Sequence, residues 1–506
     1  MSRIRETDVL VIGGGINGAG IARDLAGRGL SVTLCEKDDL ASATSSASTK
    51  LIHGGLRYLE HYEFGLVRKA LKEREVLLKA APHIIWPLTF VLPHHKGLRP
   101  RWMIRLGLLL YDHLGGRITL PKSKAVLMTG TRLGQPLKQP YRRGFTYADC
   151  WVEDTRLVVL NALDAAEKGA EILTRTECVK LERHAKQDLW AATLYDHATE
   201  SKSKVYARMV VNASGPWVAK TLKLAGEEIG RYQVRWVKGS HIIVPRLYQG
   251  DHAYILQNDD KRIVFVIPYE KKYSLIGTTD IEYRGDIEEV RIDIEEVDYL
   301  CGAVSHYFRQ KVVPKDVLWT YSGVRPLLDD GQSDAQSVTR DYVLDTEEYQ
   351  GLPVLSVYGG KITTFRCLSE EVADMVVARL ARGGSTWTAE APLPGAEGAG
   401  ANFETFLKTL KREFNWLPDA LSQRLARAYG TRVRDILRGC KRMSDMGHHL
   451  GDQVYECEIQ YLVAREWAKT LDDVLWRRSK MGLHTSEQTQ DKIHKLVKKL
   501  TAKPKE

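Results

Sequence analysis

The stretch TDVLVIGGGINGAGIARDLAGRGLSVTLCEKDDL, residues 7–40, decides the fold class of this chain. Its apolar runs at 8–12 and 31–35 are typical of buried strands, and the residues between them repeat near helical spacing. The turn after the first strand has G-x-G-x-x-G spacing, formed by Gly13, Gly15 and Gly18. Such glycines bring the backbone close to a pyrophosphate whose charge faces a helix N-terminus. We therefore predict a strand–turn–helix–strand unit that binds a dinucleotide.

An acidic residue ends the second predicted strand. Glu36 lies about twenty residues after the glycines, where a carboxylate accepts hydrogen bonds from ribose hydroxyls. A carboxylate there argues against the 2′-phosphate of NADP and leaves both FAD and NAD open.

The next segment, ATSSASTKLIHGGLRYLE at 43–60, combines small hydroxyl residues with a Gly-Gly pair. A flexible Ser/Thr loop has a similar composition, but here an amphipathic helix is expected directly afterwards, over 57–81. We therefore expect the segment to lie against the cofactor. The residues expected to contact it are Lys37, Thr44, Ser45, Ser46, Ser48, Thr49, His53, Gly54 and Gly55.

Charge and composition limit the partners. The net charge of +10 and a pI near 9.0 favour nucleic acid, a membrane surface or a phosphorylated substrate. Seven cysteines without a CxxC pair indicate neither a zinc site nor a disulfide framework, and they favour a reducing compartment. We expect no metal, no signal peptide and no membrane-spanning helix.

Several motifs in the same order resemble one enzyme family. They include TSSASTKLIHGGLRYLEHYEF (44–64), KGSHIIVP (238–245), TYSGVRPL (320–327) and VYGGKITTFR (357–366). Over nearly its whole length the chain resembles the FAD-dependent, quinone-linked glycerol-3-phosphate dehydrogenases of the aerobic bacterial type. The resemblance implies oxidation of sn-glycerol 3-phosphate to dihydroxyacetone phosphate by FAD, with electrons passed to ubiquinone or menaquinone. It also implies a homodimer attached peripherally to the cytoplasmic face of the inner membrane, on an anionic lipid surface.

The implied fold is α/β, with three parts. A discontinuous Rossmann-like FAD-binding domain of D-amino-acid-oxidase type is expected at 1–75, 145–225 and 337–384, and a β-rich substrate-capping domain at 76–144 and 226–336. A linker rich in Gly, Ala and Pro follows at 385–400, and an α-helical domain at 401–506. Later segments expected to return to the cofactor contribute Ser214, Gly215, Gly359, Gly360, Lys361, Ile362 and Thr363.

Gly359 and Gly360 are expected to open a helix whose N-terminus faces the flavin, although an ordinary strand-to-helix turn has the same pattern. For the substrate phosphate we expect Arg57, Arg325 and Arg340, because a guanidinium fork suits a phosphate, together with Tyr58 and Lys361. Arg340 is also placed to pair with the neighbouring carboxylate.

Oxidation of an alcohol also requires a proton acceptor, and His241 is the first candidate because its pKa lies in the useful range. A core histidine within a strand is nearly as good an explanation, and His53 and Lys361 are alternatives. The catalytic residues expected are His241, Lys361 and Arg325.

Residues 99–117 mix apolar residues with arginines, as in an interfacial segment on anionic lipid or a helix buried beneath the cap. Three competing functions stay open: a glycerol-3-phosphate oxidase that uses oxygen, an amine or amino-acid oxidase, and a flavin-containing RNA-associated protein. No RNA-reading motif supports the last, so we expect no nucleic-acid partner.

Overall fold

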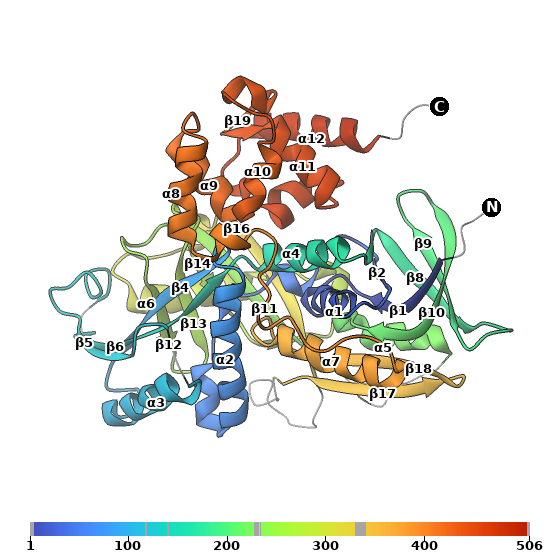
Figure 1. Ribbon diagram of the computed structural model, residues 1–506. Coiled ribbons are helices and arrows are strands. Elements are labelled where there is room, and N and C mark those ends of the chain that lie inside the picture. Colours follow the sequence, from blue (N-terminus) through green and yellow to red (C-terminus); the bar gives the residue numbers. More distant parts are fainter. Residues whose placement is uncertain are drawn as a thin grey trace.

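The computed structural model describes residues 5–116, 119–138, 141–226, 232, 234–328 and 341–502. Two large sheets lie side by side, and the C-terminal helices lie together against one side of them (Figure 1). Arg340, one of the expected phosphate ligands, lies outside the described residues.

The first sheet has the order β17-β18-β10-β1-β2-β7, with β9 paired to β10 and β8 paired to β9. Its strands are β1 (Arg5–Ile12), β2 (Val32–Glu36), β7 (Glu171–Thr174), β8 (Thr176–Arg183), β9 (Trp190–Asp196), β10 (Ser201–Asn212), β17 (Val343–Tyr349) and β18 (Leu352–Tyr358). The central strands β18, β10, β1, β2 and β7 are parallel. Parallel pairing of segments so far apart in sequence makes this domain discontinuous, as expected.

Both faces of this sheet are covered. Val9 and Val11 of β1 belong to a core shared with α1 (Ile16–Gly27), α4 (Asp154–Glu167) and α7 (Phe365–Leu380). Leu10 and Ile12 point to the opposite face and pack in a core with Trp190 and with residues near α5 (Val218–Leu222). Alternate side chains of a strand face opposite sides, so a strand buried on both sides is apolar throughout.

The second sheet has the order β15-β11-β14-β13-β12-β4-β6-β3, with β16 on β11 and β5 on β6. Its strands are β3 (Leu51–Ile52), β4 (Ile85–His94), β5 (Lys124–Leu127), β6 (Arg143–Val152), β11 (Val234–Pro245), β12 (Ala253–Gln257), β13 (Ile263–Tyr269), β14 (Tyr273–Gly277), β15 (Ile281–Glu282) and β16 (Trp319–Leu328). The helices α2 (Phe64–Ala80), α3 (Arg101–Leu114) and α6 (Ile294–Tyr307) pack with it.

The structure differs from four of the sequence-based expectations. Residues 145–152, expected with the FAD-binding segments, belong to β6 of the second sheet, and the boundary expected at 75/76 falls inside α2. The helix expected over 57–81 is broken, because a 3-10 helix at Leu56–His61 ends before α2 and Tyr62 between them has φ +60°. The predicted linker 385–400 is docked, with Leu393 buried and the indole of Trp387 donating to the Asp24 carbonyl at 3.1 Å.

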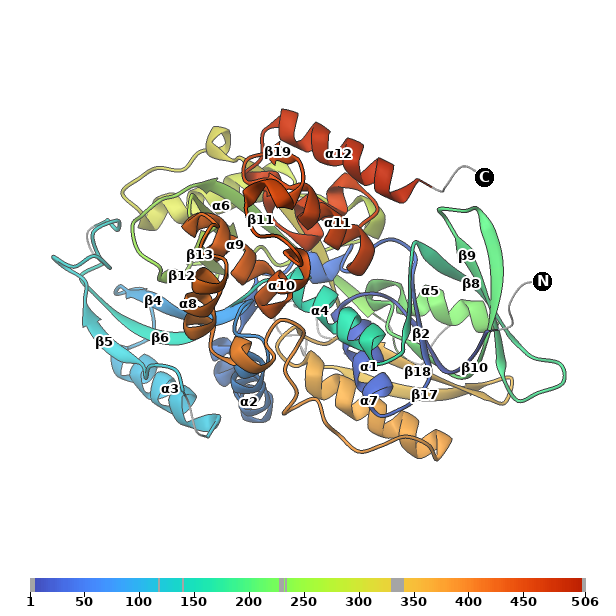
Figure 2. The ribbon, with the colours of Figure 1, turned by 45° about the horizontal axis from the view of Figure 1, so that its top comes forward.

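The C-terminal part has a core of its own. It contains α8 (Phe403–Glu413), α9 (Asp419–Tyr429), α10 (Val433–Ile436), β19 (His449–Gly451), β20 (Val454–Tyr455), α11 (Glu456–Arg465), a π-helix at Asp473–Arg478 and α12 (Glu487–Thr501). Of these helices, α10 and α11 lie near α4 (Figure 2), and α3 lies at the opposite end of the molecule from the C-terminal part (Figure 1). Among the described residues, no helix is both long and apolar enough to cross a bilayer.

Candidate active site

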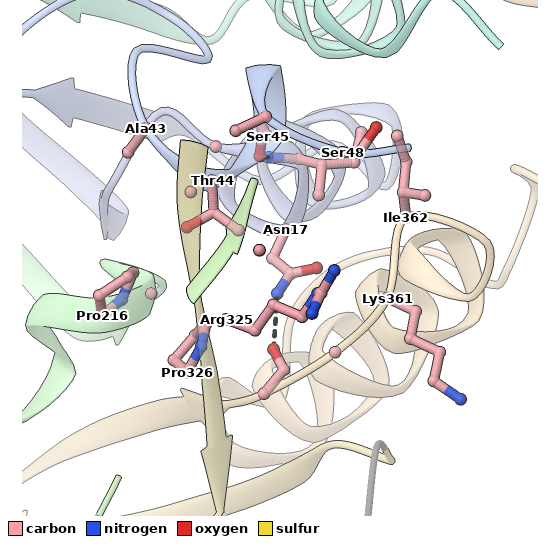
Figure 3. A pocket seen from close by; sticks show the side chains of 18 of the residues that line it. Asn17, Ala43, Thr44, Ser45, Ser48, Pro216, Arg325, Pro326, Lys361 and Ile362 are labelled. Carbon is pink, nitrogen blue, oxygen red and sulfur yellow. Dashed lines mark hydrogen bonds between the residues drawn. The ribbon is translucent and has the colours of Figure 1, made fainter. Parts of the chain in front are cut away.

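A cavity of about 430 Å³ is lined by residues of both sheets. It begins at the turn between β1 and α1, continues along the hydroxyl-rich segment after β2, and ends between the second sheet and the loop after β18. Figure 3 shows that chain segments far apart in sequence contribute its walls, among them those of Ser45, Arg325 and Lys361. The lining residues extend from the glycine turn to the second sheet, so the cavity can hold a dinucleotide at one end and a small substrate at the other.

The glycine turn forms one end of this cavity, and its geometry fits a dinucleotide. Gly13 has φ +114°, and a Cβ there would lie 2.5 Å from the carbonyl oxygen of Ala213. A Cβ at Gly18 would lie 1.9 Å from the carbonyl oxygen of Gly13, so the turn has no room for either side chain. Gly15 caps α1, and the first two residues of this helix, Ile16 and Asn17, line the cavity. A bare turn at a helix N-terminus is suited to a pyrophosphate.

Glu36 supplies the carboxylate expected beside the ribose. It lines the cavity and accepts hydrogen bonds from the amides of Gly14 at 2.6 Å and Asp38 at 2.9 Å. Burial raises the pKa of Glu36 to about 7, although the two amides act in the opposite direction. A carboxylate held this rigidly is placed to accept hydrogen bonds from the hydroxyls of an adenosine ribose.

Most of the hydroxyl-rich segment reaches the cavity, but its hydroxyls are largely engaged with the protein. Thr44, Ser45, Ser48 and Thr49 line the cavity. Within this set, Thr44 donates to the Val324 carbonyl at 2.6 Å, Ser45 accepts from the Ile16 amide at 2.9 Å, and Ser48 donates to Asp154 at 2.8 Å. The segment therefore forms a fixed wall more than a set of free phosphate donors.

Other residues expected at the cofactor divide into two groups. Ser46 and Gly54 do not line the cavity: the Ser46 hydroxyl donates to the Ala43 carbonyl at 2.9 Å, and the Gly54 amide donates to Tyr111 at 2.8 Å. Gly18 is also outside the lining, beneath the turn that it shapes. The remaining expected residues do line it, namely Lys37, His53, Gly55, Ser214, Gly215, Gly359, Gly360, Lys361, Ile362 and Thr363.

The loop after β18 differs from the expectation. Gly359 and Gly360 do not open a helix directly, because a turn at 361–364 intervenes and α7 begins at Phe365. Within this turn the Thr363 hydroxyl accepts from the His53 amide at 3.2 Å, and Asn17 donates to the Gly359 carbonyl at 3.2 Å (Figure 3). The loop is thereby tied to both cofactor-facing segments of the first domain.

Three cationic side chains are among the lining residues of the cavity. Arg57, Arg325 and Lys361 all line it, as does Tyr58, and the Lys361 ammonium lies 3.8 Å from the centre of the Tyr58 ring. These residues come from the 3-10 helix before α2, from β16 and from the loop after β18. Cations in the lining of a cavity can bind an anionic group.

Arg325 is held in a defined direction. Its guanidinium pairs with the carboxylate of Asp280 and donates to the Thr278 hydroxyl at 3.1 Å. Asp280 and Thr278 also line the cavity, and neither was singled out from the sequence, although both lie in the motif IGTTDIEY. Asn17, next to the glycine turn, also lines the cavity and was not predicted, because no rule of motif spacing marks this position.

His241, the first candidate for the proton acceptor, does not line the cavity. It lies in the middle of β11, is fully buried and stacks on Tyr321, with ring centres 4.7 Å apart. Its Nε2 lies 3.0 Å from the hydroxyl of Thr49, which does line the cavity. Burial, followed by the charges of Arg325 and Lys50, lowers the pKa of His241 well below its usual value, so the ring is neutral.

Comparisons with known proteins agree with this geometry. Residues 8–366 match the family described as FAD dependent oxidoreductase, and residues 386–504 match the C-terminal domain of alpha-glycerophosphate oxidase. The D-erythritol 1-phosphate dehydrogenase of Brucella abortus is 52% identical over 96% of this chain and 97% of its own. The glycerol-3-phosphate dehydrogenase of Pseudomonas aeruginosa is also 52% identical, over 96% of this chain and 94% of its own.

A solved structure, the glycerol-3-phosphate dehydrogenase of Bacillus halodurans complexed with FAD, is similar with a TM-score of 0.73 at 26% identity. The match covers 99% of this chain and 97% of the other. The expected fold class, the FAD cofactor and the family resemblance are therefore confirmed. The chain belongs to the family of FAD-dependent oxidoreductases, and within it to the members that carry the C-terminal domain of alpha-glycerophosphate oxidase.

Proposed function

We propose that this flavoprotein oxidises the secondary alcohol of sn-glycerol 3-phosphate and releases dihydroxyacetone phosphate. The observation that carries the proposal is that Arg57, Arg325 and Lys361 line the same cavity as the glycine turn. A phosphate monoester carries about 1.5 to 2 negative charges at neutral pH, and charge-assisted hydrogen bonds from such cations bind it well. An amino acid, whose amine is itself cationic, gains less from this set.

When bound, FAD supplies the acceptor for the hydride that leaves C2 of the substrate. The protein must then take the proton of the C2 hydroxyl, and we assign this task to neutral His241 acting through Thr49. A bound phosphate dianion offsets the positive charges of Arg325 and Lys50 and so raises the basicity of the imidazole. Arg325, directed by Asp280, binds the phosphate and orients C2. Lys361 is the competing proton acceptor.

The test is anaerobic mixing of the purified yellow protein with candidate substrates. Bleaching of the flavin band by sn-glycerol 3-phosphate, with no bleaching by glycerol or by amino acids, is the expected result. Bleaching by amino acids instead would assign the scaffold to an amino-acid oxidase. Salt-sensitive RNA binding without any bleaching by polyol phosphates would replace the proposal with an RNA-associated flavoprotein.

D-erythritol 1-phosphate is a second candidate substrate, because the relative that acts on it and the glycerol-3-phosphate dehydrogenase from Pseudomonas aeruginosa are equally identical to this chain, at 52%. Both compounds combine a phosphate monoester with a secondary alcohol, so the same cations serve either. The ratio of kcat/KM for the two compounds decides between them. We expect kcat/KM to be higher for sn-glycerol 3-phosphate. A higher kcat/KM for D-erythritol 1-phosphate would reverse the assignment.

We further propose that electrons leave to a membrane quinone and that α3 contacts anionic lipid on the cytoplasmic face of the inner membrane. The outward face of α3 exposes Trp102, Leu106 and Leu109 by 67%, 49% and 45%, while Leu108 and Tyr111 on the opposite face are buried. A helix with an exposed apolar stripe and nearby arginines is suited to lie in a membrane interface.

Co-sedimentation with vesicles tests the membrane contact. Binding to phosphatidylglycerol–phosphatidylcholine vesicles should fall when Leu106 and Leu109 are replaced by Glu, and it should persist when the exposed Ile294 of α6 is replaced by Glu as a control. Equal loss in both variants would contradict the proposal.

Formation of one hydrogen peroxide for each substrate oxidised, without reduction of a quinone, would identify an oxidase instead of a dehydrogenase. The resemblance alone supports the homodimer, which sedimentation velocity of the lipid-free protein would test.

A further inference from the structure

The segment between β2 and the hydroxyl-rich wall is held from outside the first domain. Asp39 lies in this segment, is 2% exposed and does not line the cavity. Arg478, in the π-helix of the C-terminal part, donates two parallel hydrogen bonds to the Asp39 carboxylate, at 2.6 and 2.7 Å. Arg477 adds a third at 2.6 Å. The Arg478 side chain is completely buried, so this is a desolvated, bidentate ion pair between two domains.

Two more buried ion pairs lie beside it. Arg156 of α4 binds both carboxylate oxygens of Glu466, whose carbonyl in turn accepts from Arg478 Nε at 2.7 Å. Arg175, after β7, donates to Asp473 of the π-helix at 2.7 and 2.9 Å. Burial alone raises the pKa of Asp473, but the charges of Arg175 and Arg477 outweigh it and hold that pKa well below its usual range. The π-helix is therefore fixed to the first domain by charges that water does not screen.

The same segment is joined directly to the glycine turn. Before Asp39, Glu36 accepts from the Gly14 amide at 2.6 Å; after it, the Ala41 amide donates to the Gly14 carbonyl at 3.0 Å. The Arg175 amide, from the residue that binds the π-helix, donates to the Asp38 carbonyl at 2.6 Å. A displacement of Asp39 would therefore move the ribose-facing carboxylate and the pyrophosphate turn together.

Removing one partner of a buried ion pair leaves an uncompensated charge, whereas an intact pair adds little net stability and mainly fixes geometry. At Asp39, the ion pair fixes the position of the segment that is bonded to the glycine turn of the dinucleotide site. Although no residue of the C-terminal part lines the cavity among the described residues, its π-helix determines where one wall of the cavity lies.

We propose that the C-terminal helical part serves as a retaining element for FAD, with Arg478 as a positioning residue that acts on the cofactor site through Asp39. Docking of the π-helix and binding of FAD are then linked, so that each strengthens the other. This role is independent of which polyol phosphate the enzyme oxidises.

The test compares two ion pairs that join the C-terminal part to the first domain. Arg478→Met removes the two-bond fork at Asp39 and leaves the carboxylate with its single bond from Arg477. Arg432→Gln is the matched control, because Arg432 bridges to Glu167 of α4 at 2.8 Å, away from the glycine turn. The readouts are the Kd of the full-length apoprotein for FAD, measured by quenching of flavin fluorescence, and the Tm with and without FAD. KM for the polyol phosphate at saturating FAD serves as a further control.

We expect Arg478→Met to weaken FAD binding by about tenfold or more, within the usual range of site-to-site coupling. Arg432→Gln should lower the Tm without changing the Kd, and KM should be unaffected in both variants. Asp39→Asn combined with Arg478→Met should bind FAD better than Arg478→Met alone, because the buried carboxylate that keeps only its bond from Arg477 is then replaced by a neutral amide.

Equal effects of Arg478→Met and Arg432→Gln on the Kd, or a fall in Tm with the Kd unchanged, would overturn the proposal. If Arg478→Met does not fold, Arg478→Lys keeps the charge and loses the bidentate fork, and the same comparison of Kd values applies to it. If the Kd for FAD is unchanged both in a folded Arg478→Lys and in Asp39→Asn, the proposal is overturned as well.

Discussion

Replacement of Arg325 by Ala tests the phosphate site in the most detail. Arg325 is 27% exposed, so its bonds to a bound phosphate are only partly screened. A charge-assisted hydrogen bond contributes about 1.5–3 kcal/mol, and we take about 3 kcal/mol for the fork as a whole. The variant also leaves the Asp280 carboxylate, 14% exposed, near a dianion without its guanidinium. That repulsion adds on the order of 1 kcal/mol.

Together these contributions lower kcat/KM by about 3 to 4 kcal/mol, which corresponds to roughly 150- to 1000-fold. Most of the loss should appear in KM, with a normal flavin content. Because the repulsion disappears when the carboxylate is neutralised, the double variant Asp280→Asn/Arg325→Ala should recover part of the loss, about fivefold.

The assay is steady-state oxidation with a dye acceptor, together with the visible spectrum of each purified variant. Arg284→Ala is the control for loss of one positive charge near the same sheet edge, since the Arg284 side chain is 85% exposed and does not line the cavity. An Arg325→Ala protein that is colourless would show that Arg325 supports the cofactor. A coloured variant with unchanged KM would refute the phosphate role.

Three further predictions concern the cofactor site and pH. Gly13→Ala should yield folded protein without FAD, because the new Cβ would lie 2.5 Å from a carbonyl oxygen; normal flavin content would contradict this. Burial raises the pKa of Glu36 to about 7, so the carboxylate forms, and the affinity of the apoprotein for FAD should increase, as the pH rises through that value. The affinity of Glu36→Gln for FAD should not change over the same pH range. The rate of flavin reduction at saturating substrate should show no inflection near pH 6.5, because burial, the largest cause of the lowered pKa of His241, persists when a bound phosphate offsets the charges of Arg325 and Lys50. An inflection there would contradict a neutral His241.

The sequence was sufficient wherever the structural requirement is local. The strand, turn, helix and second strand at 7–40 were predicted because the glycine spacing, the apolar runs and Glu36 all lie within one short segment. The presence of Arg57 and Arg325 in the cavity lining was also predictable, since each lies near glycines in a distinctive motif, whereas their role toward a substrate stays a prediction. These features depend on neighbours in sequence, which a single chain displays directly.

Features that depend on long-range pairing were not predicted. The assignment of β6 to the second sheet depends on its partners β4 and β3, and no local pattern encodes a partner. The burial of His241 depends on β11 lying between β14 and β16. The ion pair of Asp39 with Arg478 joins residues 439 positions apart, and each residue alone has the appearance of a solvated charge.

The break before α2 and the short turn before α7 have a different cause. Both follow from backbone conformations in which a residue leaves the helical region, at Tyr62 with φ +60° and at Gly360 with φ +101°. Apolar periodicity continues through such positions, so a pattern-based prediction extends or advances the helix. The consequence for function is that Lys361, Ile362 and Thr363 of this loop, and not a helix terminus, line the cavity.

The central claim is that the cationic end of the cavity presents C2 of a polyol phosphate for hydride transfer to FAD. Its most direct test is single-turnover bleaching of the flavin by sn-glycerol 3-phosphate carrying deuterium either at C2 or at C1. We predict complete bleaching that is slower with deuterium at C2 and unchanged with deuterium at C1. No bleaching, or the same rate with deuterium at C2 as with hydrogen, would contradict the account.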